Sequence, residues 1–347
     1  MIILGLMSGT SLDGLDIAAC KFWKGVDGWK FDILKAETFD YTLSETDMLK
    51  NAYYLSGLDL ISLHHQYGNL LGEKVKQFCE VNNIQPDYIA SHGHTIFHQP
   101  HKRLTFQLGH GSNIAANSGI KTICDFRTSD VAYGGQGAPL VPIGDELLFS
   151  EYDYCLNLGG ISNISFNEMG VRKAFDIGIC NMALNNLAED INLKFDKDGL
   201  VAQTGNVDEL LLEQLMNSAN SNHINKQSLG YEWYVSHLQP IINHSNATIA
   251  NKMRTFCEFI AIQIAQEIKK EGKILVTGGG AKNKFLQKCI QNKVTAQIVI
   301  PNQTLIDFKE ALIFAFLGLL RVKEQPNCLS NVTGAIKDNI GGCIYLP

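Results

Sequence analysis

The sequence predicts an α/β protein built from two lobes, and three observations lead to this prediction. The chain has 347 residues, a length that suggests two domains of ordinary size. Apolar strand segments alternate with segments of helical spacing. Both halves of the chain open in the same way, with a strand, a glycine-rich turn and a second strand. A cleft between two such lobes is a typical place for a ligand to bind.

The first lobe is predicted to cover residues 1–132. A strand from Ile2 to Met7 leads into the polar turn "SGTSLDG", and a second strand from Leu15 to Phe22 forms a hairpin with the first. The segment "WKFDILKAETFDY" supplies a third strand, and residues 45–81 have the apolar spacing of a helix. The segments "YIASHGHTIFH" and "TFQLG" are predicted as strand ends that carry polar residues, and "GSNIAANSG" as a short helix closed by Gly119.

The second lobe is predicted to cover residues 133–347, with a C-terminal end that can pack back on the first lobe. The stretch "RTSDVAYGGQGAPLVPIGDELL" concentrates Gly and Pro, which favours a crossover between lobes over a regular element. Predicted strands follow at "YCLNLGG", "ISFNE", "KAFDIG", "KILVTGGG" and "AQIVIP". Helices are predicted from Met182, from Lys284 and over "FKEALIFAFLGLL".

Charge and composition exclude several classes of partner. The net charge of -6 and the pI of about 5.9 provide no field that attracts nucleic acid or anionic lipid. The nine cysteines include no CxxC pair and read as reduced, mostly buried thiols of a cytoplasmic protein. The apolar run from Ala311 to Leu320 is too short to span a bilayer, and the first residues lack the pattern of a signal peptide. We therefore expect no membrane partner.

The segment "MSGTSLDGLD", from Met7 to Asp16, is the first candidate for phosphate binding. Its two glycines permit close approach of backbone N–H groups to phosphate oxygens, and Thr10 and Ser11 add donors. Asp13 and Asp16 could hold Mg²⁺, which prefers oxygen ligands. The alternative is a hairpin turn that needs Gly and Asp only for its shape. The segment is not a Walker loop, because no Gly-Lys-Ser/Thr follows.

Two further glycine turns follow strands in the second half. The segment "LNLGGISNIS" covers residues 156–165, and "VTGGGAKN" covers residues 276–283, where a nucleobase or ribose could lie flat on the backbone. One glycine-rich turn is weak evidence for a ligand site. Three such turns at strand ends indicate a nucleotide site more strongly.

Together these motifs make the chain similar to the anhydro-N-acetylmuramic acid kinase family of the sugar kinase, Hsp70 and actin superfamily. The similarity runs over nearly the whole length, through "GTSLDGLD", "SHGHTIFH", "DFRTSDVAYGGQGAPLVP", "LNLGGISNI", "FDIGICN", "VTGGGAKN" and "EALIFAFLG". It implies two ribonuclease H-like lobes of the actin-like ATPase and sugar kinase architecture, with ATP and Mg²⁺ between them, and it suggests a homodimer. In this family water opens the 1,6-anhydro bond of the sugar and the freed oxygen is phosphorylated, which gives N-acetylmuramic acid 6-phosphate for peptidoglycan recycling.

The resemblance also implies roles for individual residues. It implies that Asp176, in "FDIG", is the general base that activates water. Asp13 is the predicted metal ligand, because Mg²⁺ prefers oxygen ligands. The implied ATP-binding residues are Gly9, Thr10, Ser11, Leu12, Asp13, Gly14, Leu15, Asp16, Gly159, Gly160, Gly278, Gly279, Gly280 and Asn283.

The segment around Asp176 departs from the family pattern, which reads like "FDTGPGN". Ile177, Ile179 and Cys180 replace Thr, Pro and Gly, and Asn185 and Asn186 stand where an acidic residue is expected. This departure puts the substrate geometry and rate in question more than the class of reaction. The alternative role for Asp176 is an N-cap of the helix that follows it.

The candidate sugar-binding residues are His92, Thr95, Arg127, Asp130 and Gln136. Arg127 could bind the lactyl carboxylate of a muramic sugar as a two-pronged donor, or could form a structural ion pair instead. The histidines of "SHGHTIFH" favour sugar contact or solvated imidazoles over zinc, because no Cys or acidic partner is near. Glu310 could face the cleft or could serve as a first-turn acid of its helix.

Two alternative functions remain open from the sequence. One is a kinase of the same fold that acts on another sugar, and the other is a nucleotide-dependent switch without turnover. The retained Asp176 and the polar segments favour an enzyme.

Overall fold

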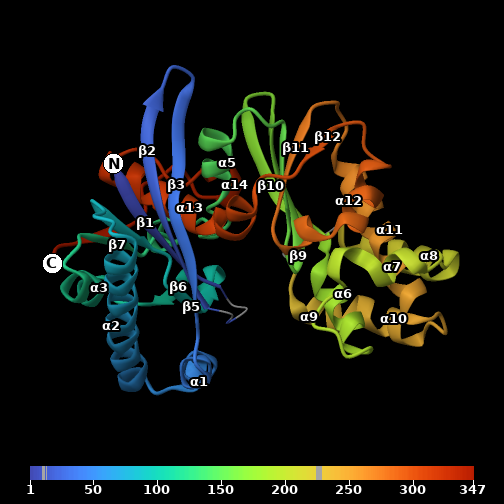
Figure 1. Cartoon of the computed structure of the whole chain (residues 1–347), viewed down its shortest axis with the longest axis horizontal. Coiled ribbons are helices and arrows are strands. Elements are labelled where there is room, and N and C mark those ends of the chain that lie inside the picture. Colours follow the sequence, from blue (N-terminus) through green and yellow to red (C-terminus); the bar gives the residue numbers. More distant parts are fainter. Residues whose placement is uncertain (10–11, 13, 224–228) are drawn as a thin grey trace. The chain divides into compact units, whose positions relative to one another are not determined.

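A computed structural model gives the fold of residues 1–9, 12, 14–223 and 229–347. The chain divides into two compact units (Figure 1), of which unit 1 comprises Met1–Ser150 with Phe308–Pro347 and unit 2 comprises Glu151–Asp307. Each unit has its own mixed β-sheet, so the predicted α/β class is confirmed. Among the described residues, no helix has the length and apolar character needed to cross a membrane.

The main sheet of unit 1 has six strands in the order β13-β7-β4-β1-β2-β3. These strands are β1 (Ile2–Ser8), β2 (Gly14–Gly25), β3 (Gly28–Asp40), β4 (Tyr88–Ser91), β7 (Thr122–Cys124) and β13 (Cys343–Tyr345). The first three form the predicted antiparallel meander, and β4 pairs with β1 in parallel, with Leu6 opposite Ser91. A separate hairpin consists of β5 (His94–Gln99) and β6 (Leu104–Leu108).

The helices of unit 1 cover this sheet. They are α1 (Leu43–Asn51), η1 (Ala52–Tyr54), α2 (Gly57–Asn82), η2 (Pro100–Lys102), α3 (Gly111–Ser118), α4 (Thr128–Ala132), α5 (Pro142–Leu148), α14 (Ser330–Thr333) and most of α13 (Gln303–Val322). Gly5 of β1 allows α13 to pack directly on the sheet, since a Cβ at this position would overlap the Ala311 carbonyl. The predicted helix over residues 45–81 is two helices, because Ser56 caps the start of α2 with its side chain.

The predicted crossover segment differs from the structure. It contains the regular elements α4 and α5 and belongs to unit 1, which continues to Ser150. Its helices are anchored inward, since Asp130, Val131 and the start of α5 are buried. The predicted boundary after Ala132 therefore falls inside unit 1, and the C-terminal forty residues return to that unit.

Unit 2 has a five-stranded sheet in the order β10-β9-β8-β11-β12. Its strands are β8 (Tyr154–Leu158), β9 (Ile161–Glu168), β10 (Val171–Ile179), β11 (Lys273–Thr277) and β12 (Gln297–Val299). The meander of β8, β9 and β10 followed by the parallel partner β11 repeats the arrangement of β1, β2, β3 and β4 in unit 1. This repetition confirms that both halves open with a strand, a polar turn and a strand.

The helices of unit 2 enclose its apolar core. They are α6 (Asn181–Glu189), η3 (Lys197–Gly199), α7 (Leu200–Thr204), α8 (Glu209–His223), α9 (Tyr231–Trp233), η4 (Tyr234–Leu238), α10 (Gln239–His244), α11 (Ile249–Glu267), η5 (Gly279–Lys282) and α12 (Lys284–Gln291). Helix α11 is central to this core, with Phe256, Phe259 and Ile260 at most 1% exposed. Burial of each such side chain contributes roughly 2 kcal/mol to the stability of the fold. This packing holds the strand ends of the sheet in a fixed arrangement.

Candidate active site

The turn between β1 and β2 carries the first predicted phosphate loop. Thr10, Ser11 and Asp13 lie outside the described residues. Leu12 has a left-handed backbone, with φ of 58°, and donates its N–H to the Gly9 carbonyl over 3.3 Å. The Leu12 N–H is therefore occupied within the turn.

The residues that follow this turn have structural and solvent-facing roles. Gly14 begins β2 so close to β3 that a Cβ would lie 2.6 Å from the Phe39 carbonyl oxygen. Leu15 is 1% exposed and belongs to the core of unit 1, so its predicted contact with nucleotide is limited to its backbone. Asp16 keeps its carboxylate partly exposed and accepts a hydrogen bond of 2.6 Å from the Thr38 hydroxyl.

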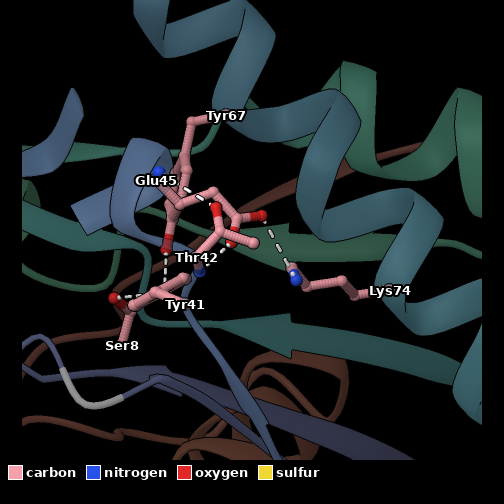
Figure 2. Close-up of polar contacts among 6 residues, drawn as sticks. All are labelled: Ser8, Tyr41, Thr42, Glu45, Tyr67 and Lys74. Carbon is pink, nitrogen blue, oxygen red and sulfur yellow. Dashed lines mark hydrogen bonds and ion pairs between the residues drawn. The ribbon is translucent and has the colours of Figure 1, made fainter. Parts of the chain in front are cut away.

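A chain of hydroxyl groups fixes Ser8, the last residue of β1 before this turn. Figure 2 shows Tyr41 between Ser8 and Tyr67: the Tyr41 hydroxyl donates to Ser8 Oγ over 2.8 Å and lies 2.6 Å from the Tyr67 hydroxyl. On its other side Ser8 Oγ lies 3.0 Å from Nδ1 of the buried His94. Because Tyr41 gives its one proton to Ser8, the Tyr67 hydroxyl donates to Tyr41. The sequence contained no signal for these hydrogen bonds, because the four residues are far apart along the polypeptide.

The α1 helix that follows Tyr41 is tied to α2 in the same region. Thr42 and Glu45 form a capping box, in which Glu45 Oε2 accepts the Thr42 N–H over 2.7 Å. Glu45 also forms an ion pair of 3.3 Å with Lys74 of α2, as the dashed line in Figure 2 shows. These contacts hold Tyr41 in place at the entry to α1.

The two glycine turns of unit 2 lie next to each other. Because β8 and β11 are parallel neighbours, with Asn157 opposite Thr277, the turns that follow them meet at one edge of the sheet. Gly278 has φ of 81°, and a Cβ there would lie 2.5 Å from Asn157 Oδ1. At Gly160 and Gly279 a Cβ would meet nothing closer than 3.8 Å. The backbone is therefore open to a ligand at these two positions.

Helix α6 begins against the first of these turns. The N–H of Cys180 donates to the Gly160 carbonyl over 2.9 Å, and the Asn181 N–H donates to the Gly159 carbonyl over 3.1 Å. The Asn181 side chain donates to the Leu158 carbonyl over 2.7 Å. The glycine carbonyls are thus occupied by the helix, which leaves the turn N–H groups as the polar groups that can face an anion. Sequence reasoning missed this anchoring role of Asn181.

Asn283 has a structural role that its predicted contact with nucleotide did not include. Its Oδ1 caps α12 by accepting the Leu286 N–H over 2.9 Å. Its backbone N–H donates to Gly280, which fixes the end of the third glycine turn.

Asp176 lies within strand β10, opposite Asn163 of β9, three residues before the strand ends. The register shifts between Asp176 and Gly178, as at a β-bulge, which often re-aims a side chain. The carboxylate is partly buried and accepts a hydrogen bond from the Leu229 N–H. Burial raises the pKa of Asp176 above its ordinary value, and the Leu229 N–H opposes this shift. The alternative role as an N-cap is wrong, since Cys180 occupies the N-cap position of α6.

The residues that depart from the family pattern around Asp176 are packed into the core of unit 2. Ile177, Ile179 and Cys180 are at most 2% exposed. Asn186 accepts hydrogen bonds from the Tyr234 hydroxyl over 2.9 Å and from Gln239 over 3.1 Å. These substitutions therefore act on packing and on a neutral hydrogen-bond cluster.

In unit 1, His92 and Arg127 form one polar assembly. His92 follows β4 and is 6% exposed, and its Nε2 lies 3.1 Å from Arg127 Nε and 2.9 Å from Arg127 Nη2. Arg127 Nη1 donates to the Gly137 carbonyl over 2.6 Å. Within the described part of the chain Arg127 forms no ion pair, and Glu310 lies within its electrostatic reach. The prediction that His92 contacts sugar does not fit its burial and its occupied ring nitrogens.

Asp130 is a fully buried hub, with no exposed surface. Its Oδ2 accepts the Gly137 N–H over 2.7 Å, and its Oδ1 accepts from Thr333 Oγ1 and Asn339 Nδ2, each over 2.8 Å, and from Cys328 over 3.1 Å. The predicted contact between Asp130 and sugar does not fit this environment, because the carboxylate is enclosed by its own donors.

The remaining sugar candidates keep accessible side chains. Gln136 is exposed beside the anchored Gly137, and its N–H donates to the Thr333 carbonyl. Thr95 of β5 is partly exposed, with Gln107 Nε2 at 3.4 Å from its hydroxyl. Glu310 of α13, which was not among the sugar candidates, is also exposed. In unit 1, Arg127 therefore lies close to Gln136, since it contacts the neighbouring Gly137. Both keep some exposed surface, whereas His92 and Asp130 are buried.

The chain is similar to one family of known proteins along its whole length. The family model described as Anhydro-N-acetylmuramic acid kinase matches residues 1–347. The anhydro-N-acetylmuramic acid kinase of Hydrogenovibrio crunogenus is 32% identical over 367 residues, which cover 100% of this chain and 98% of that protein. The corresponding kinase of Vibrio cholerae is 32% identical over 368 residues, with the same coverage.

Among solved structures, the activator of the 2-hydroxyisocaproyl-CoA dehydratase from Clostridium difficile with bound ADPNP aligns with 93% of this chain and 97% of its own. The identity is 12% and the TM-score is 0.46.

Proposed function

The chain belongs to the anhydro-N-acetylmuramic acid kinase family, and from this premise we propose how its residues carry out the reaction. It is an ATP-using kinase and therefore a phosphotransferase. We propose that it opens 1,6-anhydro-N-acetylmuramic acid with water and phosphorylates the freed oxygen, giving N-acetylmuramic acid 6-phosphate. The full-length match to the family carries this proposal.

Asp176 is proposed as the general base. It takes a proton from water, whose oxygen forms a bond to C1 of the sugar while the C1–O6 bond breaks. O6 then forms a bond to the γ-phosphorus, and the bond from that phosphorus to the β-γ bridging oxygen breaks, releasing ADP. The raised pKa supports this role, because a base whose pKa lies closer to neutrality accepts a proton more readily.

The glycine turns are proposed to bind ATP. Gly160 and Gly279 support this role because the space at their Cα atoms is open, so that phosphate or ribose can approach the backbone. Asp13 and Asp16 supply carboxylate oxygens of the kind that Mg²⁺ prefers, and the metal would neutralise phosphate charge when bound.

The cysteines are all free, which supports a reducing compartment such as the cytoplasm.

Arg127 is proposed to bind the lactyl carboxylate of the sugar. Arg127 is a partly exposed residue with no ion-pair partner among the described residues, and a guanidinium in this state is suited to pair with a ligand carboxylate. Gln136, which is exposed, and Thr95, which is partly exposed, belong to the same unit and are proposed to add hydrogen bonds to the sugar.

ADP release with a panel of sugars tests this function. We expect rapid release with 1,6-anhydro-N-acetylmuramic acid and little release without sugar. Release only with an unrelated sugar would favour a different kinase of this fold. Binding of ATP without any sugar-dependent release would favour a nucleotide switch and would overturn the proposal.

A further inference from the structure

His92 is buried beside Arg127 in a geometry that fixes the position of its proton. Its Nδ1 lies 2.9 Å from the Gly93 carbonyl oxygen, which can only accept, so Nδ1 carries a proton. Its Nε2 lies within 3.1 Å of two Arg127 nitrogens, which can only donate, so Nε2 carries a lone pair. His92 is therefore neutral. Burial, followed by the charge of Arg127, holds its pKa well below its ordinary value, in agreement with the contacts.

The ring of His92 has little freedom to move. Its centroid lies 4.7 Å from that of Phe314, a core residue of α13 that is 3% exposed. Gly93, which accepts from Nδ1, has φ of 73° and could not carry a Cβ without overlapping the Leu108 carbonyl. The Nε2 lone pair is therefore held in one direction.

The contacts of Arg127 leave a particular part of its guanidinium available. Arginine has five N–H donors, and three of them are used in Arg127. The Nε and Nη2 atoms each direct one N–H to His92, and Nη1 donates one to the Gly137 carbonyl. The remaining two are one N–H on Nη1 and one on Nη2, the two nitrogens at the end of the group. This pair matches the two oxygens of a carboxylate.

The neutrality of His92 has a consequence for ligand binding. A buried Asp or Glu at this position would also orient Arg127, but it would neutralise the charge before a ligand arrived. A neutral imidazole orients the guanidinium and leaves its full positive charge for an anion.

We infer that His92 is a positioning residue, which orients the Arg127 guanidinium so that its two end N–H groups bind the carboxylate of the sugar substrate. This inference rests on the proposed function, in which Arg127 binds the lactyl group. His92 itself touches no substrate and acts only through Arg127.

Kinetics with two variants test the role. H92F retains a ring against Phe314 and loses the acceptor, whereas H92Q retains an acceptor oxygen within reach of Arg127. We expect H92F to raise the KM for 1,6-anhydro-N-acetylmuramic acid about tenfold, as loss of a charge-assisted hydrogen bond would, while kcat changes little. H92Q should recover most of the affinity. A KM of H92F equal to that of the wild type would overturn the role of His92.

A double variant separates positioning from a direct contact. If His92 acts only through Arg127, H92F combined with R127M should have the same KM as R127M alone. Effects of the two substitutions that multiply would show that His92 acts independently and would overturn the inference. No turnover of this sugar by the wild-type protein would instead overturn the proposed function and, with it, the sugar as the ligand of Arg127.

A spectroscopic measurement on the wild-type protein tests the geometry even if the variants fold poorly. ¹⁵N NMR of labelled histidine reports which ring nitrogen carries the proton. We expect His92 to be neutral with its proton on Nδ1 at neutral pH. A proton on Nε2 would contradict the inference, because Nε2 could not then accept from Arg127.

Discussion

Asp130 and Asp176 are two carboxylates that the sequence analysis predicted as residues of the active site, and their surroundings in the structure differ greatly. Asp130 has no exposed surface and accepts from Gly137, Cys328, Thr333 and Asn339. Asp176 is partly exposed and, among the described residues, accepts only the Leu229 N–H. The first carboxylate has its lone pairs occupied, whereas the second retains acceptor capacity for water.

This difference separates a carboxylate that holds the fold from one that can react. A buried acceptor with several donors is costly to disturb and cannot exchange partners during a reaction. A partly buried carboxylate with one donor has a raised pKa and can take a proton from a bound water. Substitution of each should therefore affect a different property.

The largest expected effect is on turnover in D176N. The amide has nearly the same shape but cannot accept a proton, so sugar-dependent turnover should fall on the order of a thousandfold. ATP affinity, measured by calorimetry, should stay within about twofold of the wild type. D190N is a matched control, because Asp190 is an exposed acid in the same unit. Turnover in D176N comparable to that of D190N would show that the base is another group.

D130A should mainly lower stability. Removal of the carboxylate leaves the donors of Gly137, Thr333 and Asn339 without their acceptor in a buried place. The expected loss is about 3 kcal/mol in the free energy of unfolding, measured with urea. D338A is the control, since Asp338 also accepts from this C-terminal segment, at Ser330, but is exposed. Equal losses in the two variants would contradict the role of Asp130 as a hub.

Two neighbouring glycines in the turn after β11 allow a paired test of whether the nucleotide approaches the backbone there. A Cβ at Gly279 meets nothing within 3.7 Å but would stand where the nucleotide approaches, so G279A should raise the KM for ATP about tenfold with stability unchanged. G278A should destabilise the fold by roughly 2 kcal/mol, because of its positive φ and its contact with Asn157. An unchanged KM for ATP in G279A would show that nucleotide does not approach this corner.

The smallest effect concerns pH. Because the pKa of Asp176 is raised from 3.8, kcat/KM should fall as pH drops through a value above 3.8. At a pH just above 3.8, the Asp176 carboxyl keeps its proton in the folded state and has lost it in the unfolded chain. The free energy of unfolding should therefore decrease as pH rises through this range. D176N should lack this part of the pH dependence of unfolding. Identical pH profiles of unfolding in D176N and the wild type would contradict the raised pKa.

Local patterns predicted the strands and their glycine turns well. The turn after β8 and the turn after β11 each carry their signal within ten residues, and the parallel pairing of these strands brings them together. Asp176 was predicted as the general base because it stands in a segment that resembles the family pattern. The split at residues 52–56 was missed, although Ser56 followed by Asp59 is a helix start.

The roles of His92 and Asp130 could not be predicted, because their partners are distant in sequence. Asp130 binds side chains more than 190 residues away, and His92 binds Arg127 across 35 residues. A polar residue beside a motif gives no sign of whether its hydrogen bonds point inward or toward a ligand. The return of the C-terminal forty residues to unit 1 agrees with a C-terminal end that can pack back on the first lobe, and it includes the pairing of β13 with β7.

The mass of the sugar product tests the central claim most directly. Incubation of the wild-type protein with ATP and 1,6-anhydro-N-acetylmuramic acid should give a sugar that has gained one water and one phosphoryl group, in an amount equal to the ADP released. The same incubation with D176N should give almost none. A product that has gained a phosphoryl group without water, or ADP without a changed sugar, would contradict the account.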